Sequence, residues 1–424
     1  MPPRTERGLS RRAFVKAAVA IGGSAALSAC VARESAPDLP QGPSDLSTLP
    51  TRQHAWNEFL ARGDHGNHLP PRHRVLLYLR YTGETPNEND RRTVEKALRN
   101  VERAYPHSHD GLLVTISYSP AYFERFDASL PESVDLQKPK ALTPFEDPKL
   151  DTPDTVIHLA SDYGQVVLGA EEALMGKKGE LNGVKIDANL DGIFERIDRR
   201  TGFVGDGLPA ENQDISGIPD SEPVPEDAPL YMGFKSGFDK DQATENDVTI
   251  GTGPFSGGTT QQISTIKLHL DQWYEQDSRY QRVAKMFCPA HAASGRVEGD
   301  GDNLGQSSGM DQCPPAKQSA RQSGVVGHSQ KTARARKNDR PIILRRDFDS
   351  TDGDEATLHF LSLQQKIGDF TKTRDAMNGT DLAANSALGT KNNNGILQYM
   401  TVTRRGNYFL PPRKLRALPP ANPT

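Results

Sequence analysis

Cysteine and long apolar runs are scarce in this 424-residue sequence, and neither sign of charge dominates. After residue 29 no stretch is apolar enough to span a bilayer, which excludes later membrane spans. The 51 Lys and Arg residues are balanced by 55 Asp and Glu residues, leaving a formal net charge of −4. Mixed charge of this kind gives no case for a nucleic-acid partner.

Only two of the three cysteines follow Cys30, so the rest of the chain has few pairing choices. Because the leader described below indicates an oxidising compartment, we predict a disulfide between Cys288 and Cys313. It would hold the Gly-, Ser- and Asp-rich segment 294–310 as a surface loop. A structural zinc site with His291 as a third ligand is an alternative, although it is one ligand short.

The first thirty residues have the composition of an export signal. Ser10 to Lys16 form a twin-arginine motif, and the apolar segment 17–29 after it is too short for a permanent span. Small residues before Cys30 match a lipoprotein cleavage site, so we predict a lipid anchor on Cys30. Ordinary cleavage nearby, which would discard Cys30, is the alternative. Either outcome predicts an extracytoplasmic protein, in the periplasm or on the cell surface, that folds before export, often around a cofactor.

The remaining residues, about 390, are enough for one large domain or two similar ones. We predict residues 31–70 to be a tether and short helix, residues 71–205 a first ferredoxin-like half, and residues 206–424 a second. The order of apolar segments in the first half is β-α-β…β-α, which is typical of a sheet covered by helices on one face. Strands are expected at 75–81, 111–118, 155–160, 257–270, 342–344 and 357–364, and helices at 89–104, 120–126, 164–175 and 366–377.

The segment from Asp187 to Asp198 resembles a calcium-binding loop. Asp198 stands where a longer, bidentate Glu is usual, and no second loop pairs with it. The same residues also predict a helix over 190–200. Both interpretations are left open.

His328 follows a short apolar run and precedes a basic loop, after which strand-like residues 342–344 lead into Arg345 and Arg346. The loop is long enough to return Arg345 beside His328. One imidazole and one guanidinium so placed can hold a metal cofactor and polarise an oxygen ligand bound to it. The alternative is a surface histidine in a basic loop.

A glycine-rich turn, Gly-Phe-Val-Gly-Asp-Gly, presents Asp206 between the two halves. Its glycines allow tight backbone turns that bring the chain close to a flat ligand. Apolar neighbours can raise a carboxyl pKa into the range useful for proton transfer, so Asp206 is a candidate proton shuttle.

These pieces occur in the order found in dye-decolourising (DyP-type) haem peroxidases, and the chain resembles that family from about Arg74 to its end. The matching pieces are the strand and short helix at 111–126, the turn at 203–209, the strand beginning at 257, His328, and the arginine strand at 343–346. The chain departs from the family pattern in having Val204 and Gly205 where one residue is usual, and Asp347 where a glycine follows the arginines.

The resemblance implies an α+β fold in which two ferredoxin-like halves form a dimeric α+β barrel that binds haem b. His328 would be the proximal iron ligand, Asp206 the distal acid/base, and Arg345 the distal arginine that contacts both haem and peroxide. The implied activity is that of an oxidoreductase, a peroxidase that reduces hydrogen peroxide with an unidentified organic reductant.

Two other classes of function stay open. One is a non-catalytic haem- or iron-handling lipoprotein that uses His328 alone. The other is a cofactor-free binding protein with the basic loop 331–340 as its contact surface. Contact with a membrane is expected only through Cys30, and the oligomeric state is left open, a homo-oligomer included.

Overall fold

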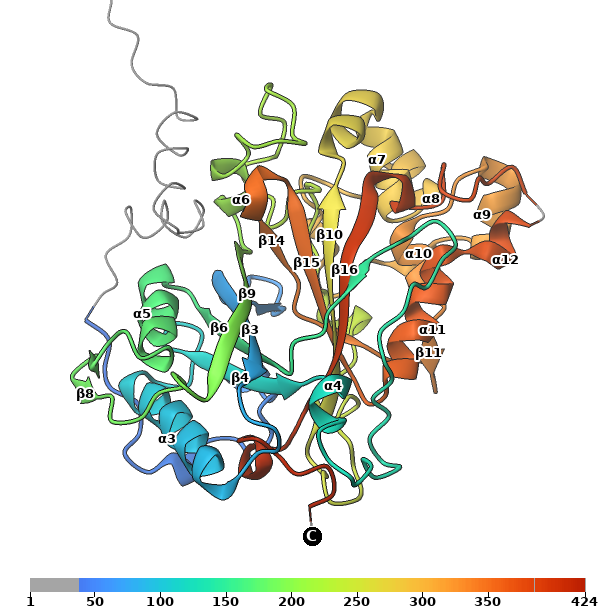
Figure 1. Cartoon of the computed structure of the whole chain (residues 1–424). Coiled ribbons are helices and arrows are strands. Elements are labelled where there is room, and N and C mark those ends of the chain that lie inside the picture. Colours follow the sequence, from blue (N-terminus) through green and yellow to red (C-terminus); the bar gives the residue numbers. More distant parts are fainter. Residues whose placement is uncertain (1–37, 385, 424) are drawn as a thin grey trace, which may run out of the picture.

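The computed structural model describes residues 38–384 and 386–423 (Figure 1). The predicted signal peptide and Cys30 lie outside the described residues. Within those residues, no helix combines the length and apolar character needed to cross a membrane.

Eight strands form a closed ring at the centre of the molecule (Figure 1). In order around the ring they are β10 (Thr259–Leu268), β15 (Thr357–Gln364), β14 (Phe348–Ser350), β9 (Phe194–Phe203), β3 (His73–Tyr81), β6 (Thr155–Ser161), β4 (Leu113–Tyr118) and β16 (Met400–Leu410), which pairs again with β10. The two junctions between the halves are narrow, with single paired positions at Asp349 and Phe203 and at Phe409 and Tyr118. The predicted α+β fold with two joined ferredoxin-like sheets is confirmed.

Two short strands extend the ring: β5 (Lys149–Leu150) runs parallel to β16, and β13 (Leu344–Arg345) pairs with β15. Small hairpins lie outside it, formed by β1 (Ala61–Arg62) with β2 (His68–Leu69), β7 (Glu180–Leu181) with β8 (Val184–Lys185), and β11 (Arg336–Lys337) with β12 (Arg340–Pro341).

Strand β3 shows why a nearly continuous apolar run is a reliable strand signal. Val75, Leu77 and Leu79 pack towards helices, whereas Leu76 and Tyr78 fill the interior of the ring. Since both faces are covered, both sets of alternating side chains must be apolar.

Helices α3 (Glu88–Ala104) and α5 (Gly164–Leu174) cover the first half. Asn87 caps α3 by accepting a hydrogen bond from the Asp90 amide. The apolar face of α3, formed by Val94, Leu98 and Val101, is buried against the sheet. Short helix α4 (Pro120–Phe123) follows β4, and α6 (Leu208–Glu211) follows β9.

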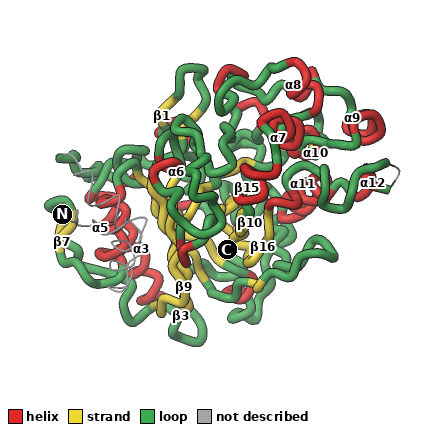
Figure 2. Tube along the Cα trace, turned by 90° about the horizontal axis from the view of Figure 1, so that it is seen from above, coloured by secondary structure: helices red, strands yellow, loops and turns green. Residues whose placement is uncertain are grey.

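A second layer of helices covers the other half, on the opposite side of the strands from α3 and α5 (Figure 2). It contains α7 (Arg279–Met286), α8 (Pro289–Ser294), α9 (Ala316–Ser323), α10 (His328–Thr332), α11 (Ile367–Asn378) and α12 (Thr380–Ala383). A π-helical turn at Gln272–Gln276, which contains Trp273, precedes α7. Trp273 itself is fully buried, as expected for a core residue.

The predicted helix over 190–200 is wrong, because residues 194–200 belong to strand β9 and the residues before them form a turn. The calcium loop is not formed either: Asp198 lies on the strand, 3.2 Å from Arg200 and 3.4 Å from Arg404, while Asp187 pairs with Lys96. The charged residues of this stretch lie on both faces of the strand: Arg199 pairs with Glu171 on α5, whereas Arg200 is buried and pairs with Asp151.

The predicted tether at 31–70 is corrected for the part from Asp38 onward, which packs on the domain. The Gly42 amide donates to the Arg103 carbonyl on α3. Gln53 is 1% exposed and donates to the carbonyls of Ile116 and Pro411. This segment therefore belongs to the folded domain.

The carboxyl-terminal tail returns to the first half and is held there by a buried ion cluster. Arg413 and Arg416 both contact Glu102 on α3, whose carboxylate is 2% exposed. The Tyr118 hydroxyl donates to the Arg416 carbonyl at 2.6 Å, and the Tyr122 hydroxyl donates to the Pro419 carbonyl at 2.8 Å.

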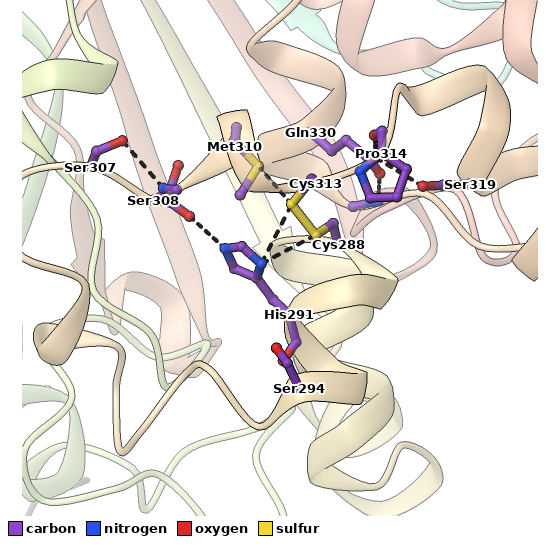
Figure 3. The surroundings of a disulfide bond; sticks show 12 residues. Cys288, His291, Ser294, Ser307, Ser308, Met310, Cys313, Pro314, Ser319 and Gln330 are labelled. Atoms are coloured by element: carbon purple, nitrogen blue, oxygen red, sulfur yellow. Dashed lines mark hydrogen bonds between the residues drawn. A yellow bond between two sulfur atoms is a disulfide. The ribbon is translucent and has the colours of Figure 1, made fainter.

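The predicted disulfide between Cys288 and Cys313 is confirmed, and it joins the start of α8 to the end of the following loop (Figure 3). His291 lies beside it, with Nδ1 at 3.5 and 3.6 Å from the two sulfur atoms and Nε2 at 3.0 Å from the Ser308 carbonyl oxygen. The three proposed zinc ligands are thus close together, but the sulfurs are bonded to each other.

Replacing Cys288 and Cys313 together with serine should lower the free energy of unfolding by about 3 kcal/mol, because the bridge closes a loop across 25 positions of sequence. Urea unfolding followed by far-UV circular dichroism measures the change. Ser294→Ala, in the same loop, is the control and should leave stability nearly unchanged. Equal stability of the double variant and the parent would show that the bridge does not restrain the unfolded chain.

Candidate functional site

A largely apolar cavity lies between the strands of the second half and the helices that cover them. Its walls come from β10, β15, β16, α10 and α11, and from the chain around β13 and β14. Its charged and titratable lining includes His328, Arg345, Asp347, Asp349, Arg374 and Arg405. Apolar walls with a few converging polar groups are typical of cofactor and small-molecule sites.

The position of His328 is fixed by a close backbone contact. His328 begins α10, and the residue before it, Gly327, packs on the Phe287 backbone so tightly that a Cβ there would lie 1.6 Å from the Phe287 oxygen. Only glycine fits at 327 without moving the backbone. The imidazole is thereby placed at the wall of the cavity.

His328 is an uncharged imidazole. Burial lowers its pKa to about 3, and the nearby charges of Lys331, Arg345 and Arg374 add to the effect. Neither ring nitrogen has a hydrogen-bond partner in the described part of the chain, and Nδ1 is fully buried. A neutral imidazole without protein partners is in the state needed to bind a metal.

Lys331, one helical turn after His328, ties α10 to the end of α11. Its amino group is fully buried and donates to the Met377 carbonyl and to the carbonyl and side-chain oxygens of Asn394. Burial lowers the pKa of Lys331 to about 6, with contributions from Arg374 and Arg334.

Arg345 lines the same cavity as His328. It lies on β13 opposite Ser362, and its backbone amide donates to the Gln242 side chain at 2.8 Å. Its guanidinium has no hydrogen bond or ion pair with any residue that the structure describes, so it is free to contact a ligand. His328 and Arg345 therefore line one cavity.

Two carboxyls beside Arg345 were not predicted as site residues: Asp347 is half-buried and Asp349 is buried. Asp347 accepts a hydrogen bond from the Leu361 amide at 3.0 Å; burial raises its pKa to about 6, although Arg345 opposes the rise. Asp349 accepts from the Tyr231 amide, its other oxygen is buried without a partner, and burial raises its pKa well above the usual range.

The alternation of side chains along an extended strand, with a period of two residues, could have identified these carboxyls. Arg345, Asp347 and Asp349 alternate with Arg346 and Phe348, as expected for extended chain. The first three line the cavity, whereas Phe348 packs inside the ring and Arg346 contacts Glu245 at 3.0 Å.

Asp206 does not line the cavity. It is exposed on the turn after β9, where Gly205 and Gly207 have φ values of 126° and 83°. It borders a neighbouring pocket, which Arg345 and Asp347 also line. His328 and Arg345 therefore line one cavity, whereas Asp206 borders the neighbouring pocket, which it shares with Arg345 and Asp347 but not with His328.

Several solved structures share this fold. A dye-decolorizing protein from V. cholerae matches with a TM-score of 0.53 and 11% identity over 86% of this chain and 99% of its own. The encapsulated DyP-type peroxidase from Mycobacterium smegmatis matches at 0.55 and 13% over 86% and 100%. A DypB variant from Rhodococcus jostii RHA1, solved in complex with heme, matches at 0.52 and 13% over 86% and 97%. At these identities the likeness establishes the fold alone.

The sequence model of a family described as a family of unknown function (DUF7405) matches residues 71–412, which covers the whole ring of strands and the cavity. No curated protein matches the chain.

Proposed function

We propose, for a chain that belongs to the DUF7405 family of unknown function, that the cavity binds haem b and that the protein is a peroxidase. The observation that carries the proposal is the pair formed by His328 and Arg345. An uncharged imidazole and a guanidinium, neither with a side-chain partner among residues 38–384 and 386–423, line one apolar cavity. The fold shared with DyP-type peroxidases supports it. Export and a lipid anchor at Cys30 remain part of the proposal, on the sequence signals given above.

When bound, haem would supply a redox-active iron. His328 would hold it, and the imidazole is suited to this because burial keeps it neutral. The orphaned nitrogen, the apolar walls and the free cation together fit such a group. The electrons would come from an organic reductant whose identity is open.

In the remaining steps, residues of the chain would transfer a proton and stabilise negative charge. Peroxide must lose a proton from one oxygen and gain it on the other before the O–O bond breaks. We assign this transfer, predicted for Asp206, to Asp347, because Asp347 lines the cavity and Asp206 does not. Arg345, permanently charged, would stabilise the negative oxygen as the bond breaks.

Absorption spectroscopy of the full chain titrated with haemin tests the proposal. A Soret band that saturates at one haem per chain, and that changes on addition of hydrogen peroxide, is the expected result. Haem binding without peroxide turnover would favour the non-catalytic haem-handling function instead. Absence of a bound-haem spectrum would exclude both.

The rate of reaction with peroxide should rise with pH through about 6, because Asp347 accepts a proton only when ionised and its pKa is raised to about 6. The charged groups that face it are Arg345, Arg74 and Asp349. Stopped-flow absorbance from pH 4 to pH 8 measures the profile. Asp347→Asn should remove this rise and slow the reaction by about 10²- to 10⁴-fold.

Asp206→Asn is the matched control for this experiment. It should keep the pH profile of the parent, because Asp206 is exposed and outside the cavity. A profile lost in Asp206→Asn and kept in Asp347→Asn would return the proton-transfer role to Asp206.

A further inference from the structure

Two buried arginines in the cavity share a single carboxylate. Arg374 comes from α11 and Arg405 from β16, and their guanidinium groups lie 3.3 and 3.0 Å from the Glu146 carboxylate. Both arginines line the cavity, and their side chains are only 6% and 2% exposed. Two positive charges therefore face one negative charge, in a region from which water is largely excluded.

Several N–H groups of this pair have no acceptor. Nε of Arg374 and both Nε and Nη1 of Arg405 are buried and unpartnered among the described residues. A buried donor without an acceptor costs about 1–3 kcal/mol, and more when it carries charge. Burial lowers the pKa of Arg405 to about 10, so the group remains charged at neutral pH.

Other buried arginines of the chain are paired differently. Arg416 is held by two carboxylates, Glu95 and Glu102. Arg200 pairs with Asp151 at 2.7 Å and stacks on the Tyr78 ring. Neither lines the cavity. At Arg374 and Arg405, by contrast, the deficit of negative charge lies at the wall of the cavity.

We propose that Arg374 and Arg405 form a carboxylate-binding subsite that holds a propionate of the porphyrin. The inference rests on the proposed function and deepens it, because it places the propionate groups of the porphyrin beside Arg374 and Arg405. Guanidinium groups bind carboxylates through paired, charge-assisted hydrogen bonds, and the free N–H groups of Arg405 are the donors for them. One propionate would also balance the charge that Glu146 leaves uncompensated.

Metal-free protoporphyrin IX and its dimethyl ester test the subsite, because neither contains the iron that His328 would bind. Binding of each to the full chain is followed by porphyrin fluorescence in the same detergent-containing buffer. The free acid should bind about 10- to 100-fold more tightly than the ester, as expected when charge-assisted hydrogen bonds are lost. Equal affinities would overturn the inference without any substitution in the protein.

Arg405→Gln shows which residue is responsible for the preference. The substitution leaves Arg374 and Glu146 as a charge-balanced pair, so the cluster keeps no unpaired buried carboxylate. It should reduce the acid-over-ester preference to within about threefold. Arg404→Gln is the matched control: it is the next residue on β16, points towards Asp198, and should keep the full preference. Full preference in Arg405→Gln would contradict the assignment.

The same titrations separate this inference from the proposed function. If protoporphyrin IX binds with the expected preference and haemin gives no ligation spectrum, the subsite stands and the role of His328 fails. If haemin is ligated and the acid and ester bind alike, the role of His328 stands and the subsite fails.

Discussion

Replacing His328 with alanine is expected to weaken haem binding by at least about 100-fold and to remove the saturable Soret band. The reason is that His328 is the uncharged, unpartnered imidazole of the cavity, and loss of a direct metal ligand should cost no less than the 10- to 100-fold typical of its supporting groups. Haemin titration followed by absorbance measures the effect. Added imidazole should restore part of the spectrum by entering the space that the side chain leaves.

The control for this substitution is His269→Ala, since His269 lies outside the cavity and its ring bonds to Thr401. Metal-free protoporphyrin IX supplies a second control, because its binding should change little in His328→Ala. An unchanged Soret band in the His328 variant would mean that another residue binds the iron, or that the haem binds elsewhere.

Replacing Glu102 with glutamine is expected to lower the free energy of unfolding by about 3–5 kcal/mol. Glu102 is the carboxylate that Arg413 and Arg416 share, and without its charge two buried guanidiniums would face each other. Urea unfolding monitored by tryptophan fluorescence measures the loss. Glu88→Gln, which removes an exposed carboxylate 3.9 Å from Arg91, should cost less than about 1 kcal/mol.

The destabilisation should depend on pH in a defined direction. Burial alone would raise the pKa of Glu102, but Arg416 and Arg413 hold it at about 2, below its ordinary value of 4.5. A carboxyl with a lowered folded-state pKa contributes its full stability above pH 4.5 and loses it as the pH falls towards 2. The stability difference between parent and variant should therefore shrink over that interval. A difference that stays constant would show that the carboxylate charge is not what holds the tail.

Strands and helices with strong periodic patterns were predictable because their signals are local. Strand β15 matches the predicted range 357–364, and α3 begins one residue from the predicted start. Strand β9 has a helix-like sequence because it carries charged side chains on both faces, and only its pairing with β3 and β14 makes it a strand. Propensity is overruled there by partners that are far away in the sequence.

Site residues could be predicted when they lie close together in the sequence, and not when their contacts join distant positions. His328 and Arg345 lie on one short stretch of sequence and line one cavity. Asp347 obeys the alternation that follows Arg345, but its burial depends on the ring around it. The contact of Arg405 with Glu146 joins positions 259 residues apart, which no local pattern can reveal.

The two halves of the ring are filled differently. All residues that line the cavity fall between 230 and 405, whereas the layer between the first sheet and α3 and α5 is one continuous apolar cluster. The two halves therefore share one architecture, but the first has a filled apolar core and the second contains a cavity. A ligand bound in the cavity should slow amide hydrogen exchange in α10 and α11. Exchange in α3 and α5 should instead report the stability of the whole domain.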